Sequence, residues 1–255
     1  MSMSHLVIFD CDGVLVDSET LSAQVMRTMA REYGASFTGD SALALIQGRK
    51  VAEWTAELSE MVGRELPEGF VPEFRKRCTD AFDRDLVAID GIEDVLTAMD
   101  PPFCCASSAP MQKIRHVLGH TGLLRFFPED RLYSAYEVKV WKPDPGLFLH
   151  AAARHGVAPE RCAVVEDSAP GVRAGIRAGM TVFAYAPDGA PAVDEATVDA
   201  VAVDEAAGTP GRAEEPRNPV TSFTSMRELP ALLRRWRSTL PDHTSPPLAP
   251  LEGMP

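Results

Sequence analysis

Short apolar runs alternate with helix-patterned segments along most of the chain. Five of these runs are expected to form strands: His5–Phe9, Phe103–Ala106, Arg131–Ser134, Cys162–Val165 and Thr181–Tyr185. Continuous apolarity of this kind is typical of strands that are covered on both faces, as in a parallel sheet flanked by helices. The pattern therefore predicts α/β architecture.

The stretch from about Glu19 to Asp90 breaks this alternation and contains no convincing strand. Apolar residues recur there at helical spacing, in two sets: Leu21, Val25 and Met29, then Phe74, Cys78, Phe82 and Leu86. Gly34, Gly48 and Gly63 are expected helix ends. This stretch therefore predicts a small, wholly helical domain that is inserted after the first strand.

Two helices outside this stretch carry recognisable end signals. Asp144 is expected to cap a helix that has Pro145 at its first position, and Gly156 is expected to end it. Ser225 followed three residues later by Glu228 forms a capping box for the final helix, which is expected to run to about residue 236.

Two further segments, 187–219 and 238–255, are rich in proline and lack apolar periodicity. They are expected to be a flexible insertion and a disordered tail, with a short strand around 198–203 as the one candidate element. Residues 187–219 hold eight acidic side chains against two basic ones, so half of the net charge of -12 belongs there. The acidity of the whole chain therefore does not argue against an anionic substrate.

Composition excludes several classes of partner. A nucleic-acid-binding protein would show a basic stripe, whereas this chain is acidic overall. No run approaches the ~20 apolar residues of a membrane-spanning helix, and the first residues lack a signal-peptide pattern. The five cysteines are odd in number and show no zinc-ligand spacing. We expect a reduced, cytoplasmic protein without nucleic-acid or membrane partners.

The first expected strand runs directly into two carboxylates, Asp10 and Asp12, followed by Gly13. Ligands of open α/β sheets bind at the carboxyl ends of the strands. Alternation in an extended segment sends both carboxylates to the same side, where their like charges call for a cation or a proton. Gly13 permits a sharp change of backbone direction. Taken alone, the same residues could also be a surface turn at a strand end.

Other polar residues follow the later strands. Ser107 and Ser108 end the second expected strand, Glu166 and Asp167 end the fourth, and Lys142 lies between them in a proline-rich loop. An acidic pair offers the oxygen ligands that Mg2+ prefers. Each could individually be a solvated turn residue, but their joint occurrence in this order at strand ends indicates one site.

These motifs resemble the four signature motifs of the haloacid dehalogenase (HAD) superfamily of Mg2+-dependent phosphotransferases. The stretches DCDGVLVDSE, WKPDP and VEDSAPGVRAGIRAGM resemble its β-phosphoglucomutase-like subgroup, and within it the bacterial 6-phosphogluconate phosphatases. The resemblance implies a doubly wound, Rossmann-like core formed by residues 1–18 and 91–237. It also implies that residues 19–90 are the helical cap of that superfamily.

The resemblance further implies a role for each motif residue. Asp10 would be the nucleophile that forms an aspartyl-phosphate, and Asp12 would be the general acid and base. Mg2+ would be held by the carboxylates of Asp10 and Asp167 and the backbone carbonyl of Asp12, with Glu166 beside the ion.

The phosphoryl group would be bound by a further set of residues: Ser107, Lys142, Gly13 and Ser108. Because Asp12 is present, a dehalogenase or a phosphonoacetaldehyde hydrolase is excluded within the superfamily. A P-type ATPase is excluded because the chain has no expected membrane spans.

Phosphatase and phosphosugar mutase differ in the cap. Ser22 and Val51 align with positions where the mutases have a histidine and a phosphate-binding arginine, which favours a phosphatase. Gly48, Arg49 and Lys50 could instead form a cationic edge for a substrate carboxylate, although an exposed basic pair on a turn is nearly as good an interpretation.

The sequence therefore predicts a monomeric phosphomonoesterase that acts on a small phosphate ester, with 6-phosphogluconate or a similar sugar phosphate as the first candidate substrate. A phosphosugar mutase is the alternative, and a non-catalytic binding or regulatory protein is a more remote one.

Overall fold

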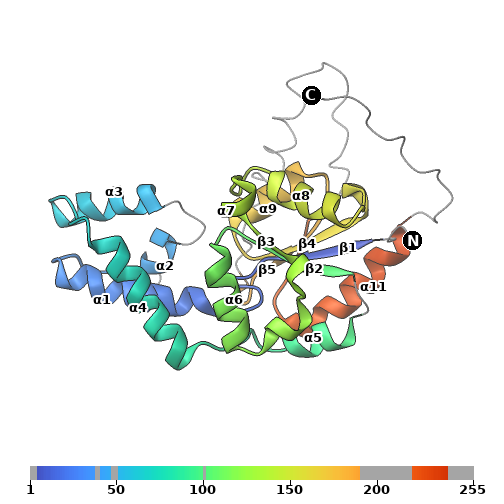
Figure 1. Ribbon diagram of the computed structural model, residues 1–255, viewed down its shortest axis with the longest axis horizontal. Coiled ribbons are helices and arrows are strands. Elements are labelled where there is room, and N and C mark those ends of the chain that lie inside the picture. Colours follow the sequence, from blue (N-terminus) through green and yellow to red (C-terminus); the bar gives the residue numbers. More distant parts are fainter. Residues whose placement is uncertain (1–4, 38–40, 47–50, 100–101, 190–219, 241–255) are drawn as a thin grey trace, which may run out of the picture.

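Six parallel strands form a single sheet at the centre of the computed structural model, which describes residues 5–37, 41–46, 51–99, 102–189 and 220–240 (Figure 1). The strand order is β3-β2-β1-β4-β5-β6. Their bounds are β1 Leu6–Phe9, β2 Phe103–Ser107, β3 Leu132–Ser134, β4 Cys162–Glu166, β5 Thr181–Tyr185 and β6 Val220–Phe223. The parallel sheet of an α/β fold is thereby confirmed.

The first five strands lie within one residue of their predicted bounds, because each is an apolar run that is buried throughout. The edge strand β6 was missed, since only Val220 and Phe223 of its four residues are strongly apolar and only Phe223 is buried. The strand expected around 198–203 lies outside the described residues.

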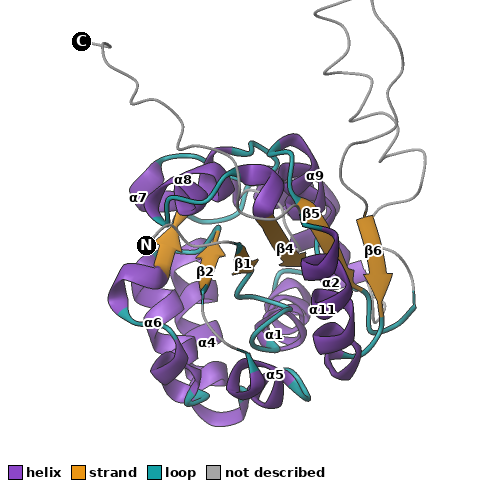
Figure 2. Ribbon diagram, turned by 90° about the vertical axis from the view of Figure 1, so that its right-hand side faces the viewer, coloured by secondary structure: helices purple, strands orange, loops and turns teal. Residues whose placement is uncertain are grey.

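Helices cover both faces of the sheet (Figure 2). One face packs against α5 (Ile92–Ala98), α6 (Met111–His120) and α11 (Leu229–Thr239), and the other against α7 (Ala135–Val138), α8 (Gly146–Arg154) and α9 (Ala169–Arg177). Side chains of β1 point alternately to the two faces. Val7 and Phe9 belong to the apolar cluster with α5, α6 and α11, whereas Leu6 and Ile8 belong to the cluster with α7, α8 and α9. This two-sided burial is the doubly wound arrangement that was predicted.

Within the described ranges, four short 3-10 helices complete the core: η1 Leu123–Phe126, η2 Glu129–Arg131, η3 Pro159–Arg161 and η4 Met226–Glu228. The capping box of Ser225 and Glu228 is confirmed, although it opens η4, which leads into α11. The predicted cap of α8 is shifted by one residue. Pro145 occupies the N-cap position, and the Asp144 carboxylate accepts a hydrogen bond from the Gly146 backbone N–H at 2.8 Å.

The other helices in the described part of the chain form a separate unit beside the sheet (Figure 1). They are α1 (Ser18–Glu32), α2 (Ser41–Ile46), α3 (Val51–Val62) and α4 (Phe70–Asp85). This unit has an apolar cluster of its own, built around Met26, Met29, Trp54, Leu58 and Phe70. The described residues between 19 and 90 form no strand, as predicted.

The helix ends of this unit agree with the glycine pattern. Gly34 and Gly63 follow α1 and α3 with φ of 96° and 71°, a left-handed conformation that favours glycine. The third expected helix end, Gly48, lies outside the described residues.

The chain enters and leaves this helical unit at neighbouring points. The Asp17 N–H donates to the Val87 carbonyl at 3.1 Å, and the Ile89 N–H donates to the Leu15 carbonyl at 3.0 Å. These two crossings lie just beyond β1, so the helical unit begins beside the carboxyl end of the central strand. Among the described residues, no helix combines the length and the apolarity that crossing a membrane requires.

Candidate active site

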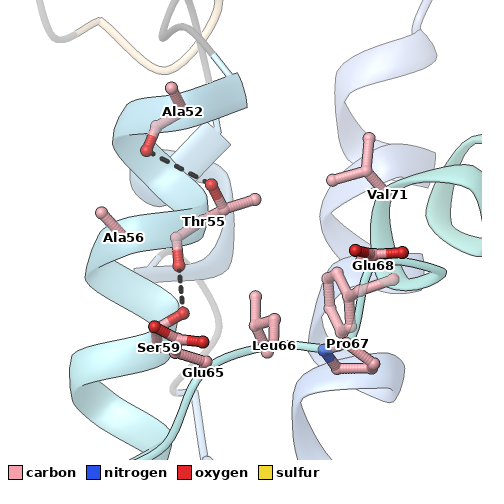
Figure 3. A pocket seen from close by; sticks show the side chains of 10 residues that line it. Ala52, Thr55, Ala56, Ser59, Glu65, Leu66, Pro67, Glu68 and Val71 are labelled. Atoms are coloured by element: carbon pink, nitrogen blue, oxygen red, sulfur yellow. Dashed lines mark hydrogen bonds between the residues drawn. The ribbon is translucent and has the colours of Figure 1, made fainter.

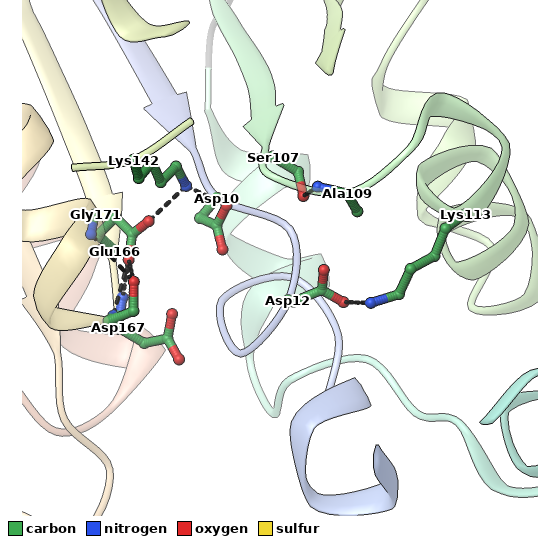
Figure 4. Close-up of polar contacts among 10 residues, drawn as sticks. Asp10, Asp12, Ser107, Ala109, Lys113, Lys142, Glu166, Asp167 and Gly171 are labelled. Atoms are coloured by element: carbon green, nitrogen blue, oxygen red, sulfur yellow. Dashed lines mark hydrogen bonds and ion pairs between the residues drawn. The ribbon is translucent and has the colours of Figure 1, made fainter. Parts of the chain in front are cut away.

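The carboxyl ends of β1, β2 and β4 bring the sequence motifs together. Phe9 in β1 is in register with Cys105 in β2 and with Val165 in β4. The residues that follow these positions therefore reach the same edge of the sheet. Figure 4 shows Asp10, Ser107 and Glu166 converging there, together with Lys142 from the loop before α8.

Lys142 joins two of the carboxylates. Its Nζ lies 2.5 Å from Asp10 Oδ1 and 2.5 Å from Glu166 Oε1, and all three side chains are buried. The ammonium also lies 4.9 Å from the ring centroid of Phe148. Burial by itself lowers the pKa of Lys142, but the charges of Asp10 and Glu166 and their hydrogen bonds raise it well above its ordinary value. Lys142 is therefore a permanent cation.

Glu166 is held rigidly by the turn that begins α9. Its Oε2 accepts hydrogen bonds from the Asp167 N–H, the Ser168 N–H and the Ser168 hydroxyl at 2.8–2.9 Å. Gly171 lies against this carboxylate, and a Cβ at that position would overlap it. The local sequence Glu-Asp-Ser-Ala-Pro-Gly therefore both starts the helix and fixes one acid of the site.

Three acids could share a metal ion. One carboxylate oxygen each from Asp10, Glu166 and Asp167 lie within 4.8 Å of one another. Burial raises the pKa of Asp10 to about 7, with Lys142 opposing and Glu166 and Asp12 adding to the shift. Burial and the neighbouring acids also raise the pKa of Asp167. A hard divalent cation such as Mg2+ fits this all-oxygen set and would relieve the repulsion.

Gly13 leaves room for this cluster. Its φ is 80°, and a Cβ there would overlap the Asp167 carboxylate. The glycine is therefore required both for the backbone conformation and for the close approach of the loop after β1 to Asp167.

Asp12 has a different set of partners. Its Oδ1 accepts from Lys113 Nζ at 2.8 Å and from the Ser18 hydroxyl. Burial alone would raise the pKa of Asp12, but the charge and hydrogen bond of Lys113 and the hydrogen bond of Ser18 bring it below its ordinary value. The charge of Asp12 contributes to the raised pKa of Asp10, so the two carboxylates act on each other. The Asp12 side chain is not among the three carboxylates that could share a metal.

The serine pair divides into a buried and an exposed member. Ser107 is buried, and its Oγ accepts from the Ala109 N–H at 3.1 Å, which shapes the turn into α6. Ser108 is exposed. Gly48, Arg49 and Lys50 lie outside the described residues, so the expected cationic edge has no structural description.

Sequence reasoning missed three residues of this site: Ser18, Glu19 and Lys113. Glu19 shares a hydrogen bond with Asp167, and burial and the charge of Asp12 raise the pKa of Glu19 to about 8. Ser18 and Glu19 stand at the end of the first motif. Lys113 comes six positions after Ser107, in the first turn of α6, and this proximity was the one available signal.

A groove of about 380 Å³ lies elsewhere, between α3 and the segment from Glu65 to Val71 (Figure 3). Thr55 and Ser59 on its wall donate hydrogen bonds to carbonyls of their own helix. None of the described motif residues lines this groove. The groove is therefore separate from the described motif residues at the sheet edge.

Comparison with known proteins agrees with this geometry. The family model of the haloacid dehalogenase-like hydrolases matches residues 5–179 of this sequence. The 6-phosphogluconate phosphatase of Escherichia coli K12 is 37% identical over 189 residues, covering 74% of this chain and 85% of that protein. A phosphorylated carbohydrates phosphatase of Thermotoga maritima is 31% identical over 178 residues, covering 68% and 81%.

A solved structure extends the similarity to three dimensions. The crystal structure of a HAD family hydrolase from Deinococcus radiodurans R1, with bound phosphate and sodium, has a TM-score of 0.71 and 28% identity. The alignment covers 93% of this chain and 98% of that one. The chain belongs to the haloacid dehalogenase-like hydrolase family and is a phosphatase of that family.

Proposed function

We propose that the protein is a Mg2+-dependent phosphomonoesterase for small phosphorylated sugars, with 6-phosphogluconate as the first candidate substrate. The observation that carries this proposal is the convergence of Asp10, Lys142, Glu166 and Asp167 at one sheet edge. The substrate class is supported by the relatives, which are named as phosphatases of 6-phosphogluconate and of phosphorylated carbohydrates.

In this proposal Asp10 is the nucleophile. One of its carboxylate oxygens forms a bond to phosphorus, and the ester oxygen departs with the electrons of the broken bond. Asp12, which must carry a proton at the start of this step although Lys113 and Ser18 lower the pKa of its carboxyl group, gives that proton to the departing oxygen. A water molecule then attacks the phosphorus, Asp12 takes the proton of the water, and the bond between phosphorus and Asp10 breaks. The products are the alcohol and inorganic phosphate, and both aspartates return to their starting state.

Charge neutralisation accompanies these steps. Lys142 and Ser107 would bind the phosphoryl oxygens, with Gly13 and Ser108 presenting nearby backbone. Asp10, Asp167 and the Asp12 carbonyl would hold Mg2+, with Glu166 beside it. The cation would neutralise phosphoryl charge that develops in transfer.

Hydrolysis is favoured over mutase activity by the start of α1. From its sequence motif, Ser22 is expected to align with the mutase histidine, and its hydroxyl donates to the Ser18 carbonyl at 2.8 Å. A hydroxyl in this arrangement offers no acid or base near neutral pH. The phosphate-binding arginine of the mutases is likewise replaced by Val51, the first residue of α3.

We also propose the domain division: a core of residues 1–18 and 91–237 and a helical cap of residues 19–90. The expected insertion and tail fall mostly outside the described residues, and the tail expected from residue 238 starts too early, because Ser238 and Thr239 continue α11. The apolar cluster that α1–α4 share and the paired crossings at Asp17 and Ile89 support the division between core and cap. A cap in this place could close over the substrate and exclude water during transfer. We propose a monomeric, cytoplasmic protein.

The test is a phosphate-release screen over sugar, nucleotide and carboxylic-acid phosphates, with Mg2+ and with EDTA. We expect turnover of sugar phosphates that EDTA abolishes. Asp10→Asn should remove turnover while the circular dichroism spectrum stays that of the wild type. A folded wild-type protein that releases no phosphate from any ester, or an Asp10→Asn variant with full activity, would contradict the proposal.

A separate assay distinguishes the mutase. The enzyme is incubated with a sugar 1-phosphate and its bisphosphate, and the products are separated. We expect free phosphate and sugar. Net isomerisation to the 6-phosphate that depends on the bisphosphate would favour the mutase instead.

A further inference from the structure

Lys113 is the one described lysine that contacts the second aspartate of the site. Its Nζ lies 2.8 Å from Asp12 Oδ1, with about a third of the lysine side chain exposed (Figure 4). Ser18 donates to the same oxygen from the start of α1. Two groups from different helices therefore hold one oxygen of this carboxylate.

The backbone of Lys113 is well anchored. α6 begins immediately after the turn that Ser107 and Ala109 form, so Lys113 stands at a set distance from the phosphate-binding serine. The next buried positions of the helix, Ile114 and Val117, are fully inside the main apolar cluster. The position of the Lys113 Cα therefore follows from core packing.

The side chain of Lys113 is restrained from its other side as well. Its Nζ lies 5.6 Å from the ring centroid of Phe82, which is buried on α4 of the helical unit. A cation over an aromatic face is attracted electrostatically by the ring. The ammonium is thus held between an aromatic ring of the helical unit and a carboxylate of the sheet edge.

The two lysines of the site divide the acids between them. Lys142 contacts Asp10 and Glu166, whereas Lys113 contacts Asp12. Without Lys113, Ser18 would be the one hydrogen-bond partner among the described residues that fixes the Asp12 carboxylate, which lies beside the charge of Asp10. The contact therefore selects one direction for a side chain that could otherwise rotate.

We propose that Lys113 is a positioning residue for phosphoryl transfer: it holds Asp12 in the orientation from which Asp12 exchanges protons with the ester oxygen and with water. This inference rests on the acid–base role proposed above for Asp12. Lys113 does not itself exchange a proton or bind the phosphoryl group.

A double-mutant cycle tests this role. We would compare wild type, Lys113→Met, Asp12→Asn and the double variant, measuring kcat and KM for two esters. One is p-nitrophenyl phosphate, whose leaving group departs without a proton. The other is the sugar phosphate that the wild type hydrolyses fastest in the screen. Arg115→Met is the matched control, because Arg115 lies on the same helix and pairs with Glu129 instead.

We expect Lys113→Met to lower kcat/KM for the sugar phosphate by about tenfold to a hundredfold, part of the ~10²–10⁴-fold that acid–base catalysis contributes. The loss should be smaller for p-nitrophenyl phosphate, and KM should change less than kcat. In the Asp12→Asn background the same substitution should change kcat/KM by no more than about twofold. Lys113→Arg should recover part of the activity, and Arg115→Met should resemble the wild type.

Other results would overturn the inference. A loss that persists in the Asp12→Asn background, or that is equal for both esters, would show that Lys113 acts on the substrate or only on folding. Thermal unfolding of each variant identifies a folding defect, and Lys113→Gln repeats the cycle with a more polar side chain if Lys113→Met unfolds. An Asp12→Asn variant with full activity would refute the proposed acid–base role of Asp12. If Asp12→Asn is inactive but Lys113→Met is fully active, only the inference about Lys113 is refuted.

Discussion

Lys142 offers a direct test of the electrostatics of the site. Its ammonium is buried between Asp10 and Glu166 at 2.5 Å from each, with side-chain exposures of 4%, 9% and 0%. The substitution Lys142→Met keeps most of the side-chain volume but removes the charge, and with it the contact between the ammonium and the Phe148 ring. Two buried carboxylates would then lose the cation that compensates them.

The expected cost is large. Removing one partner of a buried ion pair costs about 3–5 kcal/mol, because the remaining charge stays buried without compensation. A protein of this size loses about 2–4 °C in Tm per kcal/mol, so Lys142→Met should lower Tm by about 6–20 °C. The total stability of a typical domain is only about 5–15 kcal/mol, so the variant would be marginal but measurable.

The measurement is thermal unfolding by circular dichroism in EDTA at pH 7, since a metal would itself compensate the acids. Lys76→Met is the matched control, because Lys76 pairs with Asp80 on the surface of α4 with exposures of 67% and 50%. Exposed pairs of this kind contribute little to stability, because solvent screens their charges. The control should therefore shift Tm by no more than about 2 °C.

The pH dependence has a definite direction. Without Lys142, the folded-state pKa of Asp10 should rise further above its unfolded value, so the protonated form of Asp10 stabilises the fold at low pH and that stability is lost as pH rises. The variant should therefore be closer to the wild type at pH 5 than at pH 8. Adding Glu166→Gln should recover part of the lost stability. A Tm within about 2 °C of the wild type at pH 8 would refute the reasoning, because the acids could not then be buried around this lysine.

Three further outcomes are expected. Gly171→Ala should lower stability by about 1–3 kcal/mol and reduce turnover, because the new Cβ overlaps the Glu166 carboxylate. In the same unfolding and activity assays Gly119→Ala on α6 should be neutral, because a Cβ there meets no atom closer than 3.9 Å. The metal-free protein should lose stability as pH rises from about 5 to 8, because burial raises the pKa of Asp10 to about 7 and protonation of Asp10 stabilises the fold below that pH. Saturating Mg2+ at pH 8 should restore about 2–3 kcal/mol of unfolding free energy in denaturant titrations. No response to Mg2+ would contradict the metal site. Ser225→Ala should cost about 1 kcal/mol of stability by removing the capping box, and should leave kcat unchanged; a kcat effect would contradict a purely structural role.

The strands of the core could be predicted because their signal is local. Five runs of consecutive apolar residues became five buried strands, and the polar residues that end them became the site. The edge strand β6 carries a weaker signal, since a strand with one neighbour and a partly exposed surface does not need continuous apolarity. The shifted cap of α8 reflects the small energy difference between adjacent helix starts.

The order of motifs along the chain was thus enough to place Asp10, Ser107, Lys142, Glu166 and Asp167 at one end of a parallel sheet. It was enough because every parallel strand delivers its carboxyl end to the same edge. The helical unit between 19 and 90 was equally visible, since its apolar spacing differs from that of strands.

Which cation meets which acid was decided by the tertiary structure alone. Lys142 reaches Asp10 across 132 positions of sequence and Glu166 across 24, because β1 lies between β2 and β4 and brings these segments together. Lys113 reaches Asp12 because α6 packs beside the loop that leaves β1. The Lys113 ammonium also lies over the ring of Phe82 on α4. No local pattern encodes these pairings, since they depend on strand order and helix packing, and they determine how the charges of the site are balanced.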